Sequence, residues 1–134
     1  MNITRINHLG AIVGDLETAL DGFSRILGLP LDHVEKYGEE LDIAFLPCGE
    51  TLVELIKPLT EEGFSADSLR QVGPNIQHVA FEVEDIREAL AELAEKGVRP
   101  IGEAPRPGAQ NTTIAFLDPA PFGGILVELV QPNR

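Results

Sequence analysis

The stretch HVAFEVEDIREAL at residues 78–90 repeats an earlier stretch, HLGAIVGDLETAL at residues 8–20. Both stretches open with a histidine, and Asp85 stands where the first one has Asp15. Similarity at a fixed distance along a chain indicates that one structural unit occurs twice. The two stretches therefore predict two copies of one structural unit in this chain.

Two further blocks recur in the same order. IAFL at residues 43–46 reappears at 114–117, and LVEL at residues 52–55 reappears at 126–129. The three offsets are 70, 71 and 74 residues, so they drift only slightly, and a longer loop before the second LVEL block accounts for the last step. The repeat therefore spans most of the chain.

Each half predicts the same order of elements. A short alternating strand carries the histidine, and a helix follows because Asp15 and Asp85 are suitable N-caps. Glu88 lies three residues after Asp85, which is the spacing of a capping box. Gly28 and Gly97 are suited to end the two helices. Two or three more strands follow and end in LVEL, so each half is a β-α-β-β-β module.

The apolar residues of the two helices each fall on one face, as a helical period requires. These residues are Leu16, Leu20, Phe23 and Leu27 in the first half, and Ile86, Leu90, Leu93 and Ala94 in the second. The predicted fold is a single α+β domain over residues 1–134, in which modules 1–58 and 75–134 pair into a curved, partly open mixed β-sheet barrel around a metal site. The connector, 59–74, is expected to form one helical turn near 65–71.

Strand alternation predicts where the histidines and glutamates point. In the strand that contains His78, the apolar residues Val79, Phe81 and Val83 share the opposite face, which should pack under the helix. The same alternation puts three more residues on the face away from the helices: His8, Glu54 and Glu128. A cavity between two such sheets would be lined by two histidines and two glutamates.

These four residues predict a divalent-metal site. A lone histidine on a strand is more often a packed residue than a ligand, but a buried carboxylate is costly without a cation or a metal. Two such pairs at equivalent places of a repeat are hard to explain by packing alone. A donor set of two imidazoles and two carboxylates suits Zn, Co, Ni, Mn or Fe(II). The predicted ligands are His8, Glu54, His78 and Glu128.

Composition excludes several function classes. The chain has 134 residues, 43% of them apolar, and a formal net charge of −12. Such acidity repels phosphate backbones, so nucleic acid is not an expected partner. No apolar run is long enough for a membrane span, and the N-terminus does not read as a signal peptide. Cys48 is the single cysteine, which fits a reducing cytoplasm.

Other residues of the chain are weaker site candidates. His33 has no counterpart in the second half and is expected at the surface near a turn. Arg106, in the segment EAPRPGA, is expected in a loop, either in contact with a ligand or simply at the surface. The remaining glycines of interest are expected in turns: Gly102, Gly108, Gly123 and Gly124.

On these residues the sequence resembles the vicinal oxygen chelate superfamily of glyoxalases, bleomycin resistance proteins and dioxygenases, whose members pair β-α-β-β-β modules around a metal. Within it the chain looks most like the methylmalonyl-CoA epimerases. The more specific similar stretches are EAPRPGA, which begins at residue 103, and GGILVEL, which begins at residue 123. The resemblance implies the same four metal ligands and a homodimer.

The sequence departs from the epimerase pattern at three places. Gln77-His78 stands where the epimerases usually have two histidines, so the ligand is kept and its neighbour is lost. Residues 118–120, Asp-Pro-Ala, stand where the epimerases often have His-Pro-Lys, whose cation is expected to help hold an acyl-CoA. Ile43 occupies the place where some members have a catalytic Glu, and the adjacent Asp42 faces the other way.

The resemblance implies a metal-dependent epimerase that acts on methylmalonyl-CoA, or a related 2-substituted acyl-CoA, through a metal-stabilised enolate. Glu128 is the first candidate for the base, and Glu54 is its counterpart for the opposite face of the substrate. Two alternatives use the same scaffold. One is a glyoxalase I-like lactoylglutathione lyase, and the other is a non-catalytic protein that binds small molecules.

Overall fold

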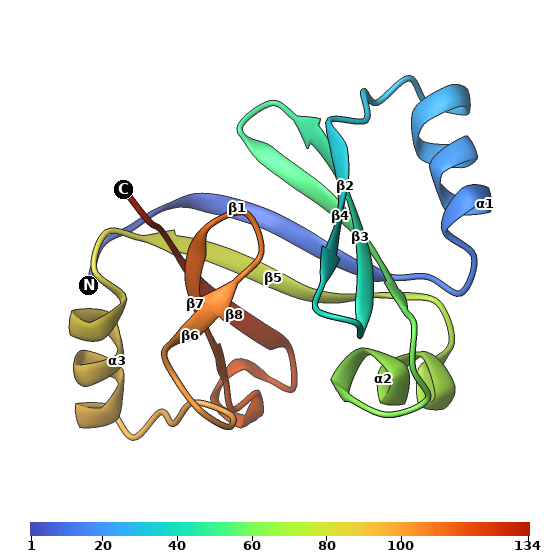
Figure 1. The fold of residues 1–134 in the computed structure, drawn as a ribbon. Coiled ribbons are helices and arrows are strands. Elements are labelled where there is room, and N and C mark those ends of the chain that lie inside the picture. The colour runs from blue at the N-terminus through green and yellow to red at the C-terminus, as the bar shows by residue number, and fades with distance from the viewer. The chain divides into compact units, whose positions relative to one another are not determined.

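The computed structural model describes all residues from 1 to 134, and Figure 1 shows its fold. The strands are β1 (Ile3–Ile12), β2 (His33–Tyr37), β3 (Leu41–Cys48), β4 (Thr51–Pro58), β5 (Asn75–Val83), β6 (Arg106–Gly108), β7 (Thr112–Leu117) and β8 (Leu126–Pro132). The helical segments are α1 (Leu16–Leu20), the π-helical η1 (Asp21–Ile26), α2 (Phe64–Val72), α3 (Ile86–Glu95) and the 3₁₀ turn η2 (Ala120–Phe122).

Strand topology confirms the predicted duplication. The hydrogen-bonded order is β2-β3-β4-β1-β5-β8-β7-β6, so the four strands of one half repeat the order of the other. β1 runs parallel to β4 and β5 runs parallel to β8, whereas the hairpin neighbours are antiparallel. The α+β class and the mixed sheet are therefore as predicted.

The chain divides into two compact units. One contains Met1–Asn7 and His78–Arg134, and the other contains His8–Gln77. The division falls within β1 and β5, so each unit uses part of both strands. The module boundaries that the repeat suggests, 1–58 and 75–134, describe similarity along the sequence and stay a prediction.

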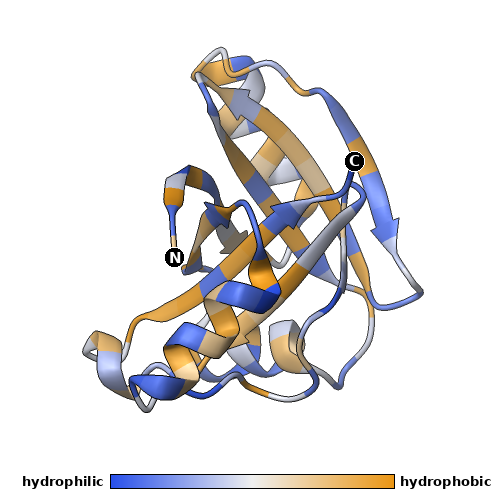
Figure 2. Cartoon of the chain, turned by 90° about the vertical axis from the view of Figure 1, so that its left-hand side faces the viewer, coloured by the Kyte–Doolittle hydropathy of each residue, from blue (hydrophilic) through white to orange (hydrophobic).

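In the unit that contains residues 78–134, the predicted apolar face is the core. Val83, Ile86 and Leu93 are buried in one cluster with residues of β7 and β8, and Val79 and Phe81 pack against it. α3 therefore covers the face of β5 that strand alternation assigned to it. Figure 2 shows how hydrophobic and hydrophilic residues interleave along the helices and strands.

In the unit that contains residues 8–77, the prediction for the first helix was wrong at one position. Leu16, Leu20 and Phe23 pack on the core as expected, but Leu27 is 69% exposed. The Leu27 amide donates to the Gly22 carbonyl at 3.0 Å, which is the wider i→i+5 spacing of a π-helix. The wider turn changes the angular position of every later residue, so Leu27 points to solvent.

The ends of the helices and the connector can be compared with the sequence. Gly28 and Gly97 follow the two main helices with φ of 83° and 81°, a conformation that suits glycine, so both predicted ends are confirmed. The connector forms α2, which is longer than the single turn expected near 65–71. None of the helices is long and apolar enough to cross a membrane.

Candidate metal centre

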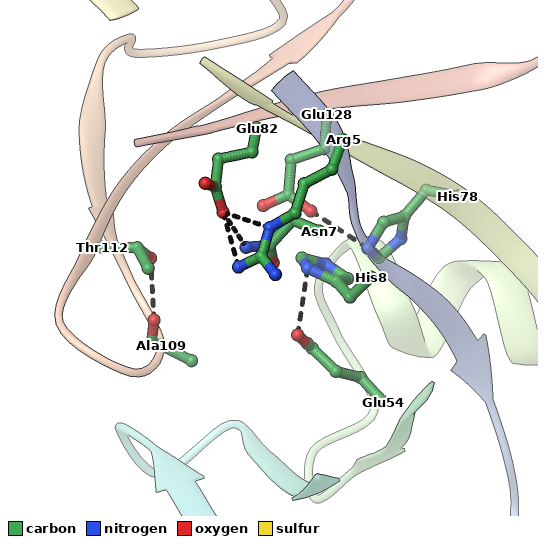
Figure 3. A network of polar contacts seen from close by, with 9 residues as sticks. All are labelled: Arg5, Asn7, His8, Glu54, His78, Glu82, Ala109, Thr112 and Glu128. Carbon is green, nitrogen blue, oxygen red and sulfur yellow. Dashed lines mark hydrogen bonds and ion pairs between the residues drawn. The ribbon is translucent and has the colours of Figure 1, made fainter. Parts of the chain in front are cut away.

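The first predicted pair, His8 and Glu54, forms within the unit that contains residues 8–77. In the parallel register of β1 and β4, Glu54 lies opposite Gly10, two residues after His8 and therefore on the same face of the sheet. His8 Nδ1 lies 3.0 Å from Glu54 Oε2 (Figure 3), and both side chains are buried. The register thus converts two residues far apart in sequence into one polar pair.

The second predicted pair, His78 and Glu128, forms within the unit that contains residues 78–134. Glu128 lies opposite Ala80, two residues after His78, which repeats the geometry of the first pair. His78 Nε2 lies 3.1 Å from Glu128 Oε1 (Figure 3), and both side chains are buried. The ring of Phe116 meets His78 edge-on, with centroids 5.2 Å apart, and supports the imidazole.

Burial singles out these four residues. His8, Glu54, His78 and Glu128 are the buried polar or charged residues of the chain, at 4–7% exposure. Burying a carboxylate is unfavourable unless a cation or a metal compensates it. Two buried carboxylates, each next to an imidazole, would therefore lower the stability of a purely structural core. The same four side chains are suitable ligands for a metal ion.

The spacing within each pair fits a bound ion. Imidazole nitrogens and carboxylate oxygens bind such ions at about 2.0–2.2 Å, so two ligand atoms of one ion lie about 3 Å apart at octahedral angles and about 3.4 Å apart at tetrahedral ones. The observed separations of 3.0 and 3.1 Å are the length of a hydrogen bond and are also close to the octahedral spacing, so each pair can close around an ion with little movement. Nitrogen and oxygen donors without cysteine suit Zn, Co, Ni, Mn and Fe(II).

Glu82, on the same strand face as His78, has a different role. Its Oε1 accepts hydrogen bonds from Arg5 at 3.0 and 3.1 Å and from Asn7 at 3.0 Å (Figure 3). Burial raises the pKa of the Glu82 carboxyl, but the hydrogen bonds from Asn7 and Arg5 outweigh it, so the pKa lies below its ordinary value. A carboxylate held in the charged form by these donors is a structural anchor between β1 and β5 within its unit.

His33 was expected at the surface, and its side chain is 39% exposed, but the sequence reading missed its partners. It begins β2, its ring stacks on Phe45 with centroids 4.9 Å apart, and its two nitrogens face Asp32 at 2.5 Å and Glu35 at 2.8 Å. The pattern Asp-His-x-Glu is the signal that could have indicated this cluster.

Two of the three departures from the epimerase pattern can be located. Ile43 is buried on β3. The carboxylate of the adjacent Asp42 pairs with Lys36 at 3.0 Å, so it does not take the place of the missing Glu. Asp118 accepts a hydrogen bond from the Ala120 amide at 3.0 Å and thereby stabilises the turn that contains η2. This turn carries no cation.

Comparison with known proteins is consistent with this arrangement. Residues 7–116 match the Glyoxalase/Bleomycin resistance protein/Dioxygenase superfamily. The chain belongs to this superfamily. As the sequence indicated, the vicinal oxygen chelate fold therefore accounts for its paired modules.

Methylmalonyl-CoA epimerases are among its relatives over nearly the full length. The ethylmalonyl-CoA/methylmalonyl-CoA epimerase of Cereibacter sphaeroides is 35% identical over 96% of this chain and 98% of its own. The crystal structure of the Mycobacterium tuberculosis methylmalonyl-CoA epimerase is 34% identical, with a TM-score of 0.91 over 98% of this chain and 90% of its own. A Streptomyces coelicolor methylmalonyl-CoA epimerase in complex with 2-nitronate-propionyl-CoA is 27% identical, with a TM-score of 0.90 over 99% and 100%.

Proposed function

We propose that this superfamily member is a metal-dependent epimerase that acts on methylmalonyl-CoA or a related 2-substituted acyl-CoA. The observation that carries the proposal is the similarity to methylmalonyl-CoA epimerases over nearly the whole length of this chain and of its bacterial relative. The two buried His–Glu pairs support it, because they supply donors of the kind that a Lewis-acidic metal needs.

Under this proposal the two pairs bind one divalent ion, with His8, Glu54, His78 and Glu128 as ligands. When bound, the ion supplies Lewis acidity to the thioester carbonyl, where negative charge develops on loss of the α-proton. The repeat supports a shared ion, because each half contributes the same two residue types at the same register positions. The identity of the metal follows from metal analysis of the purified protein.

The two glutamates have complementary roles in the proposed reaction. Glu128 removes the α-proton with one carboxylate oxygen and becomes a carboxylic acid, while the electron pair of the C–H bond moves into the thioester. Glu54 would return a proton from the carboxylate oxygen that does not bind the ion to the opposite face of the same carbon, and the electron pair of the enolate forms the new C–H bond. Exchange of protons with solvent then removes the proton from Glu128 and restores the one on Glu54. The α-proton is already acidic because a thioester and a carboxylate flank it, so two side chains suffice for the transfer.

The decisive experiment follows solvent deuterium into the substrate. The metal-loaded protein should interconvert the two epimers of methylmalonyl-CoA in deuterated water, and the α-position should gain deuterium as it does so. Glu128→Gln should lower this exchange by about a hundredfold or more, the typical contribution of a general base. Glu84→Gln, an exposed neighbour of the N-cap on α3, serves as the control and should leave exchange unchanged.

Two outcomes would replace the proposal. Rapid turnover of the methylglyoxal–glutathione adduct, with no deuterium entering methylmalonyl-CoA, would favour the lactoylglutathione lyase. Inactivity on both substrates, with metal bound, would favour a protein that binds a small molecule without converting it. Metal content must be measured for Glu128→Gln alongside its activity, because the same residue is a proposed ligand.

We also infer that the protein acts as a homodimer, as the resemblance to its superfamily implies. Light scattering at micromolar concentration should report twice the mass of one chain. A monomer under those conditions would remove this inference without affecting the proposed reaction, since each chain carries both His–Glu pairs.

A further inference from the structure

Arg106 is an unpaired cation in an acidic protein. The chain has 22 Asp and Glu residues, and half of its ten Lys and Arg residues form ion pairs with them. The paired cations are Arg5, Arg25, Lys36, Arg70 and Lys96. Arg106 forms no such pair, although it is only partly exposed. A half-buried guanidinium that lacks a carboxylate partner has unused binding capacity.

Arg106 lies on the sheet face that carries Glu128. In the β6–β7 register Arg106 pairs with Ile114, and Ile114 pairs with Val130 of β8. Ile114 and Val130 form a buried cluster with Ala80 on that face, separate from the core under α3. Contrary to the loop expected for Arg106, a strand therefore holds it in register with the residues around Glu128.

A single aromatic ring links the guanidinium to the second His–Glu pair. The Cζ atom of Arg106 lies 5.6 Å from the centroid of the Phe116 ring, and that ring meets His78 edge-on at 5.2 Å. Phe116 in turn lies opposite Glu128 in the β7–β8 register. The cation is thus held close to the proposed reaction centre of this unit.

The contact with Phe116 leaves the hydrogen-bonding groups of Arg106 available. A contact with one aromatic ring engages only part of a guanidinium, which has five N–H donors. Two parallel donors match the two oxygens of a carboxylate, which makes such a pair both strong and directional. The contact with the Phe116 ring limits the positions of the guanidinium and so reduces the freedom that binding must remove.

We propose that Arg106 binds the free carboxylate of the acyl group through paired N–H···O bonds. This inference rests on the proposed function and names the residue that selects a malonyl-type substrate over a simple acyl-CoA. The carboxylate is attached to the same carbon that loses its proton, so it must lie near Glu128. The phosphates of CoA are separated from that carbon by the long pantetheine chain, and a cation one ring from His78 is poorly placed to reach them.

Two ligands that differ only in this carboxylate test the proposal. Isothermal titration should compare methylmalonyl-CoA with propionyl-CoA, which has the same thioester and the same CoA. In Arg106→Gln the dissociation constant for methylmalonyl-CoA should rise by about tenfold or more, because a charge-assisted bidentate pair is lost. Propionyl-CoA should bind as it does to the wild type. Arg106→Lys keeps the charge but not the fork and should give an intermediate value.

Arg99→Gln is the matched control. Arg99 is exposed, forms no ion pair and belongs to the same unit, so this variant removes the same charge without the contact to Phe116. It should leave both dissociation constants unchanged. Circular dichroism of each variant confirms that the fold is kept, and Arg106→Lys serves as the second probe if Arg106→Gln does not fold.

Each other result overturns the inference. If Arg106→Gln weakens the binding of both ligands equally, Arg106 contacts the CoA part that they share. If the binding of neither ligand changes, Arg106 has no role in recognition. If the wild type exchanges deuterium normally, either result for Arg106→Gln contradicts only this inference and leaves the proposed function in place. A wild type that neither binds nor epimerises methylmalonyl-CoA fails at the level of the proposed function itself.

Discussion

At the scale of single residues, His33 shows how neighbours determine a charge. Its imidazole lies between the carboxylates of Glu35 and Asp32, and the hydrogen bond with Glu35, followed by that with Asp32, raises the pKa of His33 above its ordinary value. The ring also stacks on the fully buried Phe45. A protonated ring in this position holds the start of β2 against β3.

This cluster predicts a specific pH dependence of stability. Because the folded-state pKa of His33 is raised, its contribution is fully present below the unfolded-state pKa of about 6.5 and is lost as the pH rises through the folded-state value. Urea denaturation from about pH 6 to above the raised pKa should therefore show a declining free energy of unfolding in the wild type. His33→Gln should lack this component of the decline. Identical profiles for the two proteins would show that the cluster contributes nothing, as solvent screening permits for an exposed pair.

At the scale of elements, the two helices begin in the same way and end differently. The side chains of Asp15 and Asp85 each accept a hydrogen bond from the amide three residues later, at 3.1 Å in both cases. α3 then continues as a regular helix to Glu95, whereas α1 passes into the π-helical η1. Equivalent caps therefore start both helices, and the later sequence decides their path.

The β6–β7 hairpin depends on a glycine that sequence reasoning assigned to a turn. Gly108 lies at the end of β6, where an added Cβ would come within 2.6 Å of Ile114 Cγ2 and of Thr112 Oγ1. Both neighbours are β-branched and cannot easily rotate away. The small residue is required for close strand packing, and a positive φ is not the reason.

Gly108→Ala should destabilise the protein by about 1–3 kcal/mol, the usual cost of overpacking a tight site. The hairpin carries Arg106, so the variant should also raise the dissociation constant for methylmalonyl-CoA more than that for propionyl-CoA in isothermal titration. Gly22→Ala is the control, because no atom lies within 4 Å of the added Cβ. Its midpoint in urea should not fall. A Gly108→Ala protein as stable as the wild type would mean that β7 shifts without cost.

At the scale of the whole molecule, metal binding and stability should be linked. An ion that binds the folded state and not the unfolded chain stabilises the protein in proportion to the logarithm of its concentration over its dissociation constant. Chelation should therefore lower the melting temperature, and readdition of the metal should restore it. The change in melting temperature would report binding at the proposed ligands, which are His8 with Glu54 and His78 with Glu128.

Metal content of single variants tests the shared ion. His8→Ala and His78→Ala should each lose most of the metal, because the proposed ion needs ligands from both halves. Glu54→Gln retains an amide oxygen that can still coordinate, so partial retention there is compatible with the proposal. His33→Ala is the control and should keep full occupancy. Full occupancy in both His8→Ala and His78→Ala would exclude the site.

Sequence alone determined the duplication, the fold class, the helix starts and the four residues that form the two buried pairs. The physical reason is that strand alternation and helix capping are local, so a repeated pattern predicts the same face twice. Tertiary structure alone decided the exposure of Leu27, the partners of His33 and the place of Arg106 over Phe116. These depend on a change of helical pitch and on which side chains meet across neighbouring strands, and no local pattern encodes such contacts.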